Sequence, residues 1–192
     1  EFSYGVDQLQ AQIHAYTYEK AVIDQMTTAV YEGLSNRMGD NMTGILQKGL
    51  DLYIKVNGKW TFASVGRVST LPEKNSRTNS LVKNLYEGEK ECIIYLPGWC
   101  TLTKLEIGVD DWAEIKGMPS PFKHKVVVHG SSITHGASAS RAGLTYPAML
   151  SRNLGIDFVN FGFSGECKMQ PEFLDFLKTC DTDAFLFDAF SN

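Results

Sequence analysis

The sequence has no apolar run that approaches the roughly 20 residues of a membrane-spanning helix. It also has no excess of positive charge, because 18 Lys and Arg residues stand against 22 Asp and Glu residues, for a net charge of −4. This balance argues against nucleic acid or an anionic membrane as the main partner. Residues 1–5 contain neither the basic nor the apolar part of a signal peptide. The sequence therefore leaves the cellular compartment open, and a secreted or periplasmic location is compatible with it.

Cysteine is scarce, and the four residues present have no metal-ligand spacing: Cys92, Cys100, Cys167 and Cys180. We therefore expect no metal site and no other cofactor, and we expect these thiols to be free and buried. A bridge between Cys92 and Cys100 is the alternative in an oxidising compartment.

Three consecutive valines at residues 126–128 are followed at once by His129, Gly130 and two serines. A short β-branched run bounded by turn residues indicates a buried strand of a parallel sheet. Ligands of open α/β sheets bind beyond the carboxyl ends of the strands. The hydroxyl group of Ser132 is therefore a candidate nucleophile, although the same residues also fit an ordinary strand-to-loop turn.

The residues after this turn repeat the alternation of strand and helix. A helix is predicted over residues 145–155, with a threonine cap, a proline in its first turn and a glycine at its end. Residues 156–161 and 184–187 read as two further buried strands, with a second helix over residues 171–180 between them. Each strand ends in polar or glycine residues, which are expected to meet at one crevice: Ser132, Gly165 and Asn192.

Four spaced motifs in this half resemble the SGNH (GDSL-type) hydrolases. Residues 130–136, Gly-Ser-Ser-Ile-Thr-His-Gly, are similar to the first block of that family, and residues 160–165, Asn-Phe-Gly-Phe-Ser-Gly, to the second. Residues 139–143, Ala-Ser-Arg-Ala-Gly, and residues 188–192, Asp-Ala-Phe-Ser-Asn, complete the set found in one bacterial branch. The resemblance is specific because the four motifs occur in the order of that branch.

This resemblance implies a serine esterase with a flavodoxin-like, three-layer α/β domain built on a parallel sheet. Ser132 would be the nucleophile. The backbone N–H groups of Ser132 and Gly165 and the side chain of Asn192 would form the oxyanion hole, where preorganised donors stabilise the charge of the tetrahedral intermediate.

Three further residues are expected to contact the substrate. Ser131 stands where the family usually has an acidic residue, and His135 is interpreted as a loop residue that lines the mouth of the site. Arg141 follows the nucleophile in the next loop. It could hold a carboxylate or hydroxyl group of the substrate, or it could brace its own loop through backbone carbonyls.

The general base of the family and its orienting acid lie in an Asp-x-x-His block, but the sequence ends at Asn192 without one. A serine hydroxyl is a poor nucleophile unless a base adjoins it. Neither His129 nor His135 has an Asp nearby in the sequence at the spacing of the Asp-x-x-His block. We expect His129 to be packed or hydrogen-bonded within its strand. The sequence therefore predicts an incomplete α/β unit, whose open sheet edge a second copy of the chain could cover.

The preceding half carries the signals of short strands. Residues 52–56 alternate apolar and polar side chains, and Asn57-Gly58 then predicts a type I′ hairpin turn. Further strands are expected over residues 80–86, 91–96 and 102–109, which is typical of a β-sandwich. Residues 49–53, Gly-Leu-Asp-Leu-Tyr, also resemble the jelly-roll-like N-terminal domain of the same bacterial branch.

The first 48 residues carry weaker signals. Alternation over residues 9–18 favours a half-buried strand, with a helix as the alternative. Residues 19–38 are the least readable part of the chain and are compatible with a helix, and we expect a loop over residues 38–48. The resulting division is a β-sandwich domain over residues 1–116, with the first 40 unassigned, a linker over residues 117–125 and the start of a hydrolase domain over residues 126–192.

Together these features predict an esterase that removes acetyl or other small acyl groups from carbohydrate. Trp60, Trp99 and Trp112 could present a glycan by stacking, although packing in the core or between domains is the favoured explanation for each of them. The alternative function is a non-catalytic carbohydrate-binding or assembly module, which the missing Asp-x-x-His block favours. A thiol-dependent site at Cys167 lacks a supporting His–Asp pair.

Overall fold

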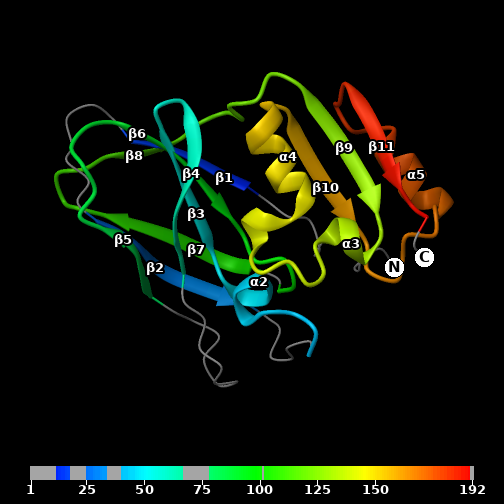
Figure 1. The fold of residues 1–192 in the computed structure, drawn as a ribbon, viewed down its shortest axis with the longest axis horizontal. Coiled ribbons are helices and arrows are strands. Elements are labelled where there is room, and N and C mark those ends of the chain that lie inside the picture. The colour runs from blue at the N-terminus through cyan, green and yellow to red at the C-terminus, as the bar shows by residue number, and fades with distance from the viewer. Residues whose placement is uncertain (1–11, 18–24, 34–39, 67–77, 101, 191–192) are drawn as a thin grey trace.

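A computed structural model describes residues 12–17, 25–33, 40–66, 78–100 and 102–190 of the chain (Figure 1). These residues form three sheets, of which the two in the N-terminal half are antiparallel and the third is parallel. The protein is thus a mixed α/β molecule. None of the described helices has the length and apolar character needed to cross a membrane.

The described residues of the N-terminal half form eight strands in two sheets. The larger sheet has the order β4 (Lys59–Val65), β3 (Asp51–Val56), β6 (Lys90–Tyr95), β1 (Gln12–Thr17) and β8 (Ile115–Gly117). The smaller sheet has the order β5 (Asn79–Lys83), β2 (Gln25–Gly33) and β7 (Leu102–Val109). The predicted hairpin is confirmed, because β3 pairs with β4 across Asn57 (φ 49°) and Gly58 (φ 77°), the two positive φ angles of a type I′ turn.

Of the expectations for the first 48 residues, one is confirmed and one was wrong. Strand β1 confirms the strand expected there, for its described part. Residues 19–38, which the sequence left unassigned with a helix as one possibility, contain strand β2, which pairs with both β5 and β7. The loop expected over residues 38–48 contains helix α2 (Gly44–Lys48), whose first turn is capped by the Thr43 hydroxyl accepting the Leu46 N–H.

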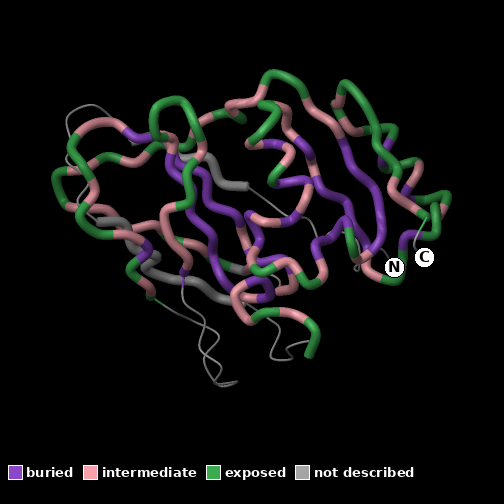
Figure 2. Tube along the Cα trace, in the orientation of Figure 1, coloured by how far each residue is buried: buried purple, intermediate pink, exposed green. Residues whose placement is uncertain are grey.

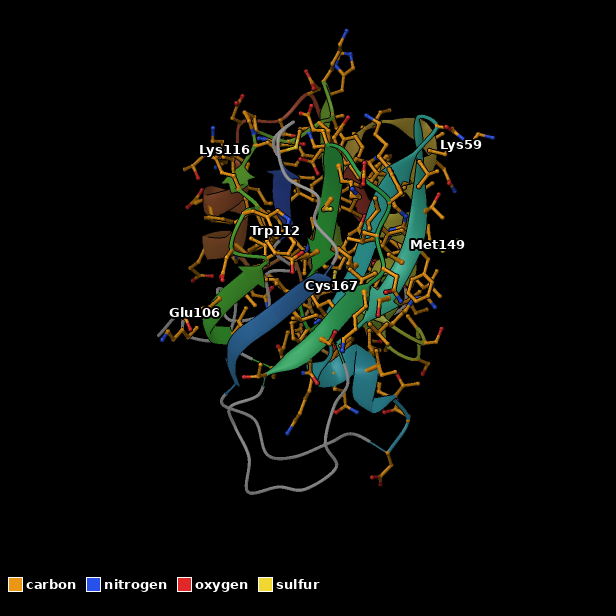
Figure 3. All side chains as sticks on the ribbon, turned by 90° about the vertical axis from the view of Figure 1, so that its left-hand side faces the viewer. Lys59, Glu106, Trp112, Lys116, Met149 and Cys167 are labelled. Atoms are coloured by element: carbon orange, nitrogen blue, oxygen red, sulfur yellow. The ribbon has the colours of Figure 1, made fainter. Side chains whose placement is uncertain are left out.

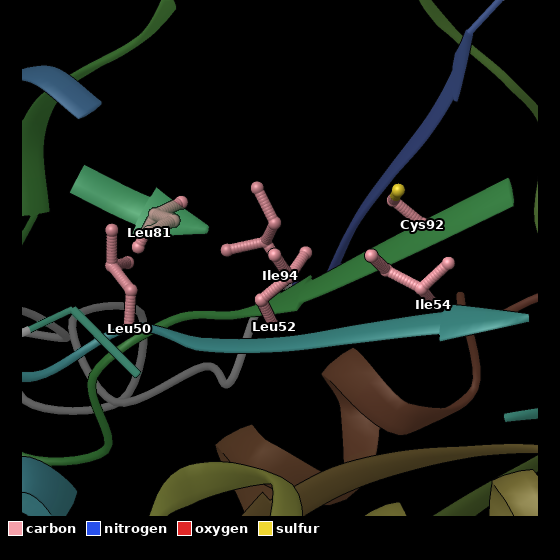
Figure 4. Packing of buried hydrophobic residues seen from close by; sticks show 6 residues of the cluster. All are labelled: Leu50, Leu52, Ile54, Leu81, Cys92 and Ile94. Carbon is pink, nitrogen blue, oxygen red and sulfur yellow. The ribbon is translucent and has the colours of Figure 1, made fainter. Parts of the chain in front are cut away.

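Strand β3 is buried on both faces. On one face, Leu52 and Ile54 join a cluster that also includes Leu81 of β5 and packs against Leu105 and Ile107 of β7, so this core lies between the two antiparallel sheets (Figure 4). On the other face, Tyr53 joins a second cluster: Ile93, Tyr95, Ala142 and Ala148. Since the last two residues belong to the α/β half, this cluster joins the two halves of the chain.

The α/β half has the predicted β-α-β-α-β order. Its sheet has the order β10 (Asp157–Gly162), β9 (Lys125–Gly130) and β11 (Ala184–Asp188), with both pairings parallel. Helix α4 (Tyr146–Leu154) has Thr145 as its N-cap residue and ends at Gly155 in the left-handed conformation, as expected from the sequence. Helix α5 (Pro171–Leu177) is shorter than predicted. Strand β9 is largely buried, whereas β11 is exposed along most of its length (Figure 2).

Candidate active site

Ser132 is the first residue of helix α3 (Ser132–His135), which starts directly beyond the carboxyl end of β9. Ser131 is the N-cap residue, and its side-chain oxygen accepts the Ile133 N–H at 3.4 Å. Ser131 is completely buried, whereas Ser132 is half-buried. The expectation that Ser131 contacts substrate is therefore corrected: it caps the helix from inside the protein. The N–H group of Ser132 lies at a helix start, where intrahelical acceptors are lacking.

Two glycines allow helix α3 to lie directly on the strand ends. A Cβ atom at Gly130 would lie 2.7 Å from Thr134 Cβ and 2.8 Å from the Asp188 carbonyl oxygen. A Cβ atom at Gly162 would overlap the backbone nitrogen of His135 and lie 2.5 Å from its Cα atom. Only glycine fits at either position without a shift of the helix that carries Ser132.

Side-chain hydrogen bonds connect helix α3 to both neighbouring strands. The Asn160 side chain donates to the Thr134 carbonyl oxygen at 2.7 Å and accepts the Gly162 N–H at 2.9 Å. The hydroxyl groups of Thr134 and Tyr146 both donate to Asp188 Oδ2, at 2.8 and 3.0 Å. The start of helix α3 is thereby fixed relative to the ends of β10 and β11.

The loop after β10 lies beside helix α3. The Phe163 N–H donates to the Gly130 carbonyl oxygen at 2.8 Å, and Ser164 Oγ lies 3.0 Å from His135 Nδ1. Gly165 is exposed in the left-handed conformation (φ 73°), and none of the hydrogen bonds found among the described residues uses its N–H. The loops that contain Ser132 and Gly165 are therefore neighbours. Asn192 lies outside the described residues.

His135 is placed differently from the sequence-based expectation. It belongs to the last turn of α3 and is only 1% exposed, so it does not line an open mouth. Its Nε2 lies 2.7 Å from the Gly98 carbonyl oxygen, and its ring stacks on Trp99 with the centroids 3.6 Å apart. Burial lowers the pKa of His135 to about 4, although the hydrogen bond to Gly98 opposes this shift. His135 is therefore a neutral, buried residue with both nitrogens engaged.

His129 is also buried, as expected, and it lies within β9. Its Nδ1 lies 2.9 Å from the Phe161 carbonyl oxygen, which can only accept a hydrogen bond, so Nδ1 carries the proton. Its Nε2 then accepts a hydrogen bond from the Cys167 thiol, whose sulfur is 3.4 Å away. Burial lowers the pKa of His129 and raises the pKa of Cys167. A neutral thiol facing a neutral imidazole does not support a thiolate nucleophile. All four cysteines are free.

A third histidine has the only His–Asp ion pair found among the described residues. His124 Nδ1 lies 3.4 Å from Asp183 Oδ2, and both side chains are exposed. This pair precedes β9, whereas Ser132 follows the other end of the same six-residue strand, on the order of 20 Å away at about 3.3 Å per residue. The pair is therefore too distant to activate Ser132.

Arg141 joins the loop after the proposed nucleophile to the N-terminal half. Its Nε lies 3.1 Å from Asp51 Oδ2, and its guanidinium group lies over the Phe62 ring, 4.1 Å from the centroid. The same Asp51 oxygen accepts the Gly143 N–H at 2.9 Å. Arg141 thus braces its loop, as one of the two interpretations had it, but its partner is a carboxylate rather than a backbone carbonyl.

Sequence reasoning did not identify Asp51 as a partner of this loop. Asp51 is completely buried, and desolvation raises its pKa to about 6, although Arg141 and the Gly143 hydrogen bond oppose the shift. One feature of the sequence could have indicated a buried Asp51: in the Gly-Leu-Asp-Leu-Tyr motif, this charged residue stands between two core leucines.

The three tryptophans lie in different environments. Trp99 stacks on His135, and Trp60 is half-buried with Lys55 Nζ 5.4 Å from its ring centroid. Trp112 is 64% exposed in the segment between β7 and β8 (Figure 3). Within the described part of the chain, no group of three or more His, Cys, Asp or Glu side chains is arranged to hold a metal ion.

Both halves of the chain match known protein families. Residues 123–192 match the GDSL-like lipase/acylhydrolase family, and residues 19–115 match the GxDLY domain, the N-terminus of SGNH-hydrolase-type esterases. A solved structure from Bacteroides ovatus, assigned to the GDSL-like lipases, is 44% identical with a TM-score of 0.85 over 94% of this chain and 51% of its own. No curated protein matches the chain.

Two more distant structures share the fold. A salicylyl-acyltransferase from a tetracycline biosynthetic pathway is 19% identical, with a TM-score of 0.68 over 91% of this chain and 46% of its own. A family two carbohydrate esterase from Clostridium thermocellum, in complex with cellohexaose, is 15% identical. Its TM-score is 0.56 over 86% of this chain and 49% of its own. The chain spans about half the length of these relatives. It belongs to the GDSL-like (SGNH) hydrolase family and carries the N-terminal GxDLY domain of that family.

Proposed function

We propose that this protein hydrolyses acyl esters with Ser132 as the nucleophile. The observation that carries the proposal is the position of Ser132 as the first residue of a short helix that two glycines and a buried hydrogen-bond network hold against the strand ends. A nucleophile needs a fixed position relative to the oxyanion donors, because misplacement by about 1 Å can reduce the rate on the order of 100-fold.

The proposed oxyanion hole consists of the N–H groups of Ser132 and Gly165 and the side chain of Asn192. The Ser132 N–H lies at the start of helix α3 and the Gly165 N–H in the adjoining loop, and no hydrogen bond found among the described residues uses either of them. Donors that are already oriented stabilise the tetrahedral intermediate without reorganisation, and each contributes about 3–4 kcal/mol.

The general base is a residue other than the three histidines whose side chains are described. His129 and His135 have both ring nitrogens engaged, and His124 lies at the opposite end of the sheet. If no base acts on Ser132, the same fold serves instead as a non-catalytic carbohydrate-binding or assembly module.

We propose acetyl or other small acyl groups on carbohydrate as the substrate class. The carbohydrate esterase with a bound cellohexaose supports this choice, although at 15% identity its likeness to this chain is one of fold. The indole of Trp112 is a candidate surface for glycan stacking, because 64% of this residue is exposed.

The division of the chain and its assembly also belong to this proposal. We propose a jelly-roll-like β-sandwich over residues 1–116, a linker over residues 117–125, and part of a flavodoxin-like three-layer domain over residues 126–192. Among the described strands of the parallel sheet, β11 is an outer one, and it carries Phe185, Leu186 and Phe187, each more than 40% exposed. This apolar strand supports a homo-oligomer in which a second copy covers the edge.

Acetate release tests the proposed substrate class. The protein as its gene encodes it is incubated with acetylated xylan, acetylated cello-oligosaccharides and p-nitrophenyl acetate. We expect a higher kcat/KM on the acetylated glycans than on the synthetic ester. Equal or lower values on the glycans would argue against carbohydrate as the substrate, while binding of glycan without acetate release would favour the binding module.

A further inference from the structure

We propose that the N-terminal half is part of the catalytic machinery, because it holds His135 in one tautomer and through it fixes the loop of Ser164 and Gly165. His135 is a positioning residue in this scheme, not a base and not a substrate contact. The inference rests on the proposed function, since the orientation of the Gly165 N–H affects a rate only if an oxyanion forms beside it.

The hydrogen-bond partners of His135 determine where its proton lies. A backbone carbonyl oxygen can only accept, so the 2.7 Å contact with Gly98 places the proton on Nε2. In a neutral ring Nδ1 is then an acceptor, and the Ser164 hydroxyl, 3.0 Å away, must be the donor. The low pKa of the buried ring keeps it neutral at physiological pH, which preserves this arrangement.

The N-terminal half holds Gly98 and Trp99 firmly. The Gly98 N–H donates to the Leu46 carbonyl oxygen at 2.9 Å, and the Trp99 N–H donates to the Gln47 carbonyl oxygen at 3.3 Å, so both residues are tied to helix α2. Trp99 also lies nearly parallel to the His135 ring, with an interplanar angle of 12°. The position of the His135 ring is thus set by a segment 37 residues away in the sequence.

The effect on the proposed oxyanion hole follows from the chain connectivity. The Gly165 N–H belongs to the peptide unit that joins Ser164 to Gly165, and Gly165 is in the left-handed conformation (φ 73°). A hydrogen bond that fixes the Ser164 side chain therefore restricts the direction of this N–H. Because the charge on the oxyanion develops in the transition state, an error in this direction lowers kcat and leaves KM nearly unchanged.

Three variants separate positioning from general stability. Ser164→Ala removes the donor to His135 Nδ1. His135→Gln keeps a donor for the Gly98 carbonyl oxygen and removes the acceptor for Ser164, whereas His135→Asn keeps an acceptor nearer to the backbone. The matched control is Ser120→Ala, which removes the 3.1 Å hydrogen bond between an exposed serine and Asp157.

The expected kinetic result is a loss of kcat on p-nitrophenyl acetate of roughly 10-fold for Ser164→Ala and His135→Gln, less than the 10²–10³-fold for loss of a whole donor. The KM values should stay within about 2-fold, His135→Asn should retain more kcat than His135→Gln, and Ser120→Ala should match the wild type. A kcat for Ser164→Ala equal to that of the control would overturn the proposal.

Nuclear magnetic resonance gives a readout that does not depend on activity. The ¹⁵N spectrum of His135 should show a protonated Nε2 and an unprotonated Nδ1, and the Gly165 amide resonance should move in His135→Gln, which leaves the neighbouring Ser164 unchanged, but not in Ser120→Ala. A protonated Nδ1, or an unmoved Gly165 resonance, would refute the positioning role. If the wild type has no Ser132-dependent activity, the proposed function fails, and the spectra still decide whether His135 positions Gly165.

Discussion

Replacement of Gly143 by alanine tests the contact between the two halves of the chain most sharply. A Cβ atom at this position would lie 2.5 Å from Tyr53 Cε2, 2.6 Å from Asp51 Oδ2 and 3.1 Å from Tyr95 Cδ2. The Gly143 N–H donates to Asp51, and its carbonyl oxygen accepts from Arg152 Nη2 at 2.6 Å. The added methyl group cannot be accommodated without moving this backbone away from both partners.

The magnitude follows from two contributions. Overpacking of a filled core costs roughly 1–3 kcal/mol. A weakened hydrogen bond to the buried Asp51 carboxylate adds up to about 1.5–3 kcal/mol. We therefore expect Gly143→Ala to lower the free energy of unfolding by roughly 2–4 kcal/mol, which corresponds to a fall of about 1–2 M in the urea midpoint at an m-value near 2 kcal/mol/M.

Urea unfolding followed by circular dichroism measures this loss, with Gly117→Ala as the matched control. An alanine Cβ at Gly117 meets no atom within 4 Å, so this variant should stay within about 0.5 kcal/mol of the wild type. If Gly143→Ala were as stable as Gly117→Ala, the described contact between the loop after Ser132 and the Gly-Leu-Asp-Leu-Tyr motif would be wrong.

Three further predictions concern the groups around this contact and helix α3. Gly162→Ala should lower the free energy of unfolding by at least about 1–3 kcal/mol, since its methyl group overlaps the His135 backbone, and a wild-type melting curve would contradict the packing described here. Tyr146→Phe removes one of two hydroxyl donors to Asp188 and should cost roughly 1–2 kcal/mol in thermal unfolding, whereas an unchanged Tm would show that this hydrogen bond is not formed. Asp51→Asn should reduce the dependence of stability on pH. The pKa of Asp51 is raised from 3.8 to about 6, so the folded state binds the proton more tightly than the unfolded state, and stability falls as the pH rises through this window. The wild type should therefore lose on the order of 2 kcal/mol more than Asp51→Asn between pH 4 and pH 7, and equal slopes in the two proteins would contradict this.

Local signals allowed much of the fold to be predicted. The Asn57-Gly58 turn and helix α4, which begins after Thr145 and ends at a glycine, depend on residues that lie close together in the sequence. Strand β2 was missed because its pairing with β7 shifts register between Thr28 and Val30, which breaks the period-two alternation on which strand prediction depends. Helix α2 was missed because it has only five residues.

The proposed site was predicted less completely, because its support comes from distant residues. The partners of His135 include Gly98, 37 residues away, and the Gly143 N–H is bonded to Asp51, 92 residues away. No local pattern contains such pairings. The alternating pattern of β3 predicts that the face with Asp51 and Tyr53 is exposed. The α/β half covers this face, so these residues of β3 are buried on both sides of the strand.

We propose above all that Ser132 is the nucleophile of an ester hydrolase. The most direct test is the hydrolysis of p-nitrophenyl acetate by the protein as its gene encodes it, beside Ser132→Ala and the control Ser80→Ala, a substitution of an exposed serine in β5. We predict that Ser132→Ala falls to the rate of the uncatalysed reaction, while Ser80→Ala retains the wild-type rate. Hydrolysis that persists in Ser132→Ala would contradict the account.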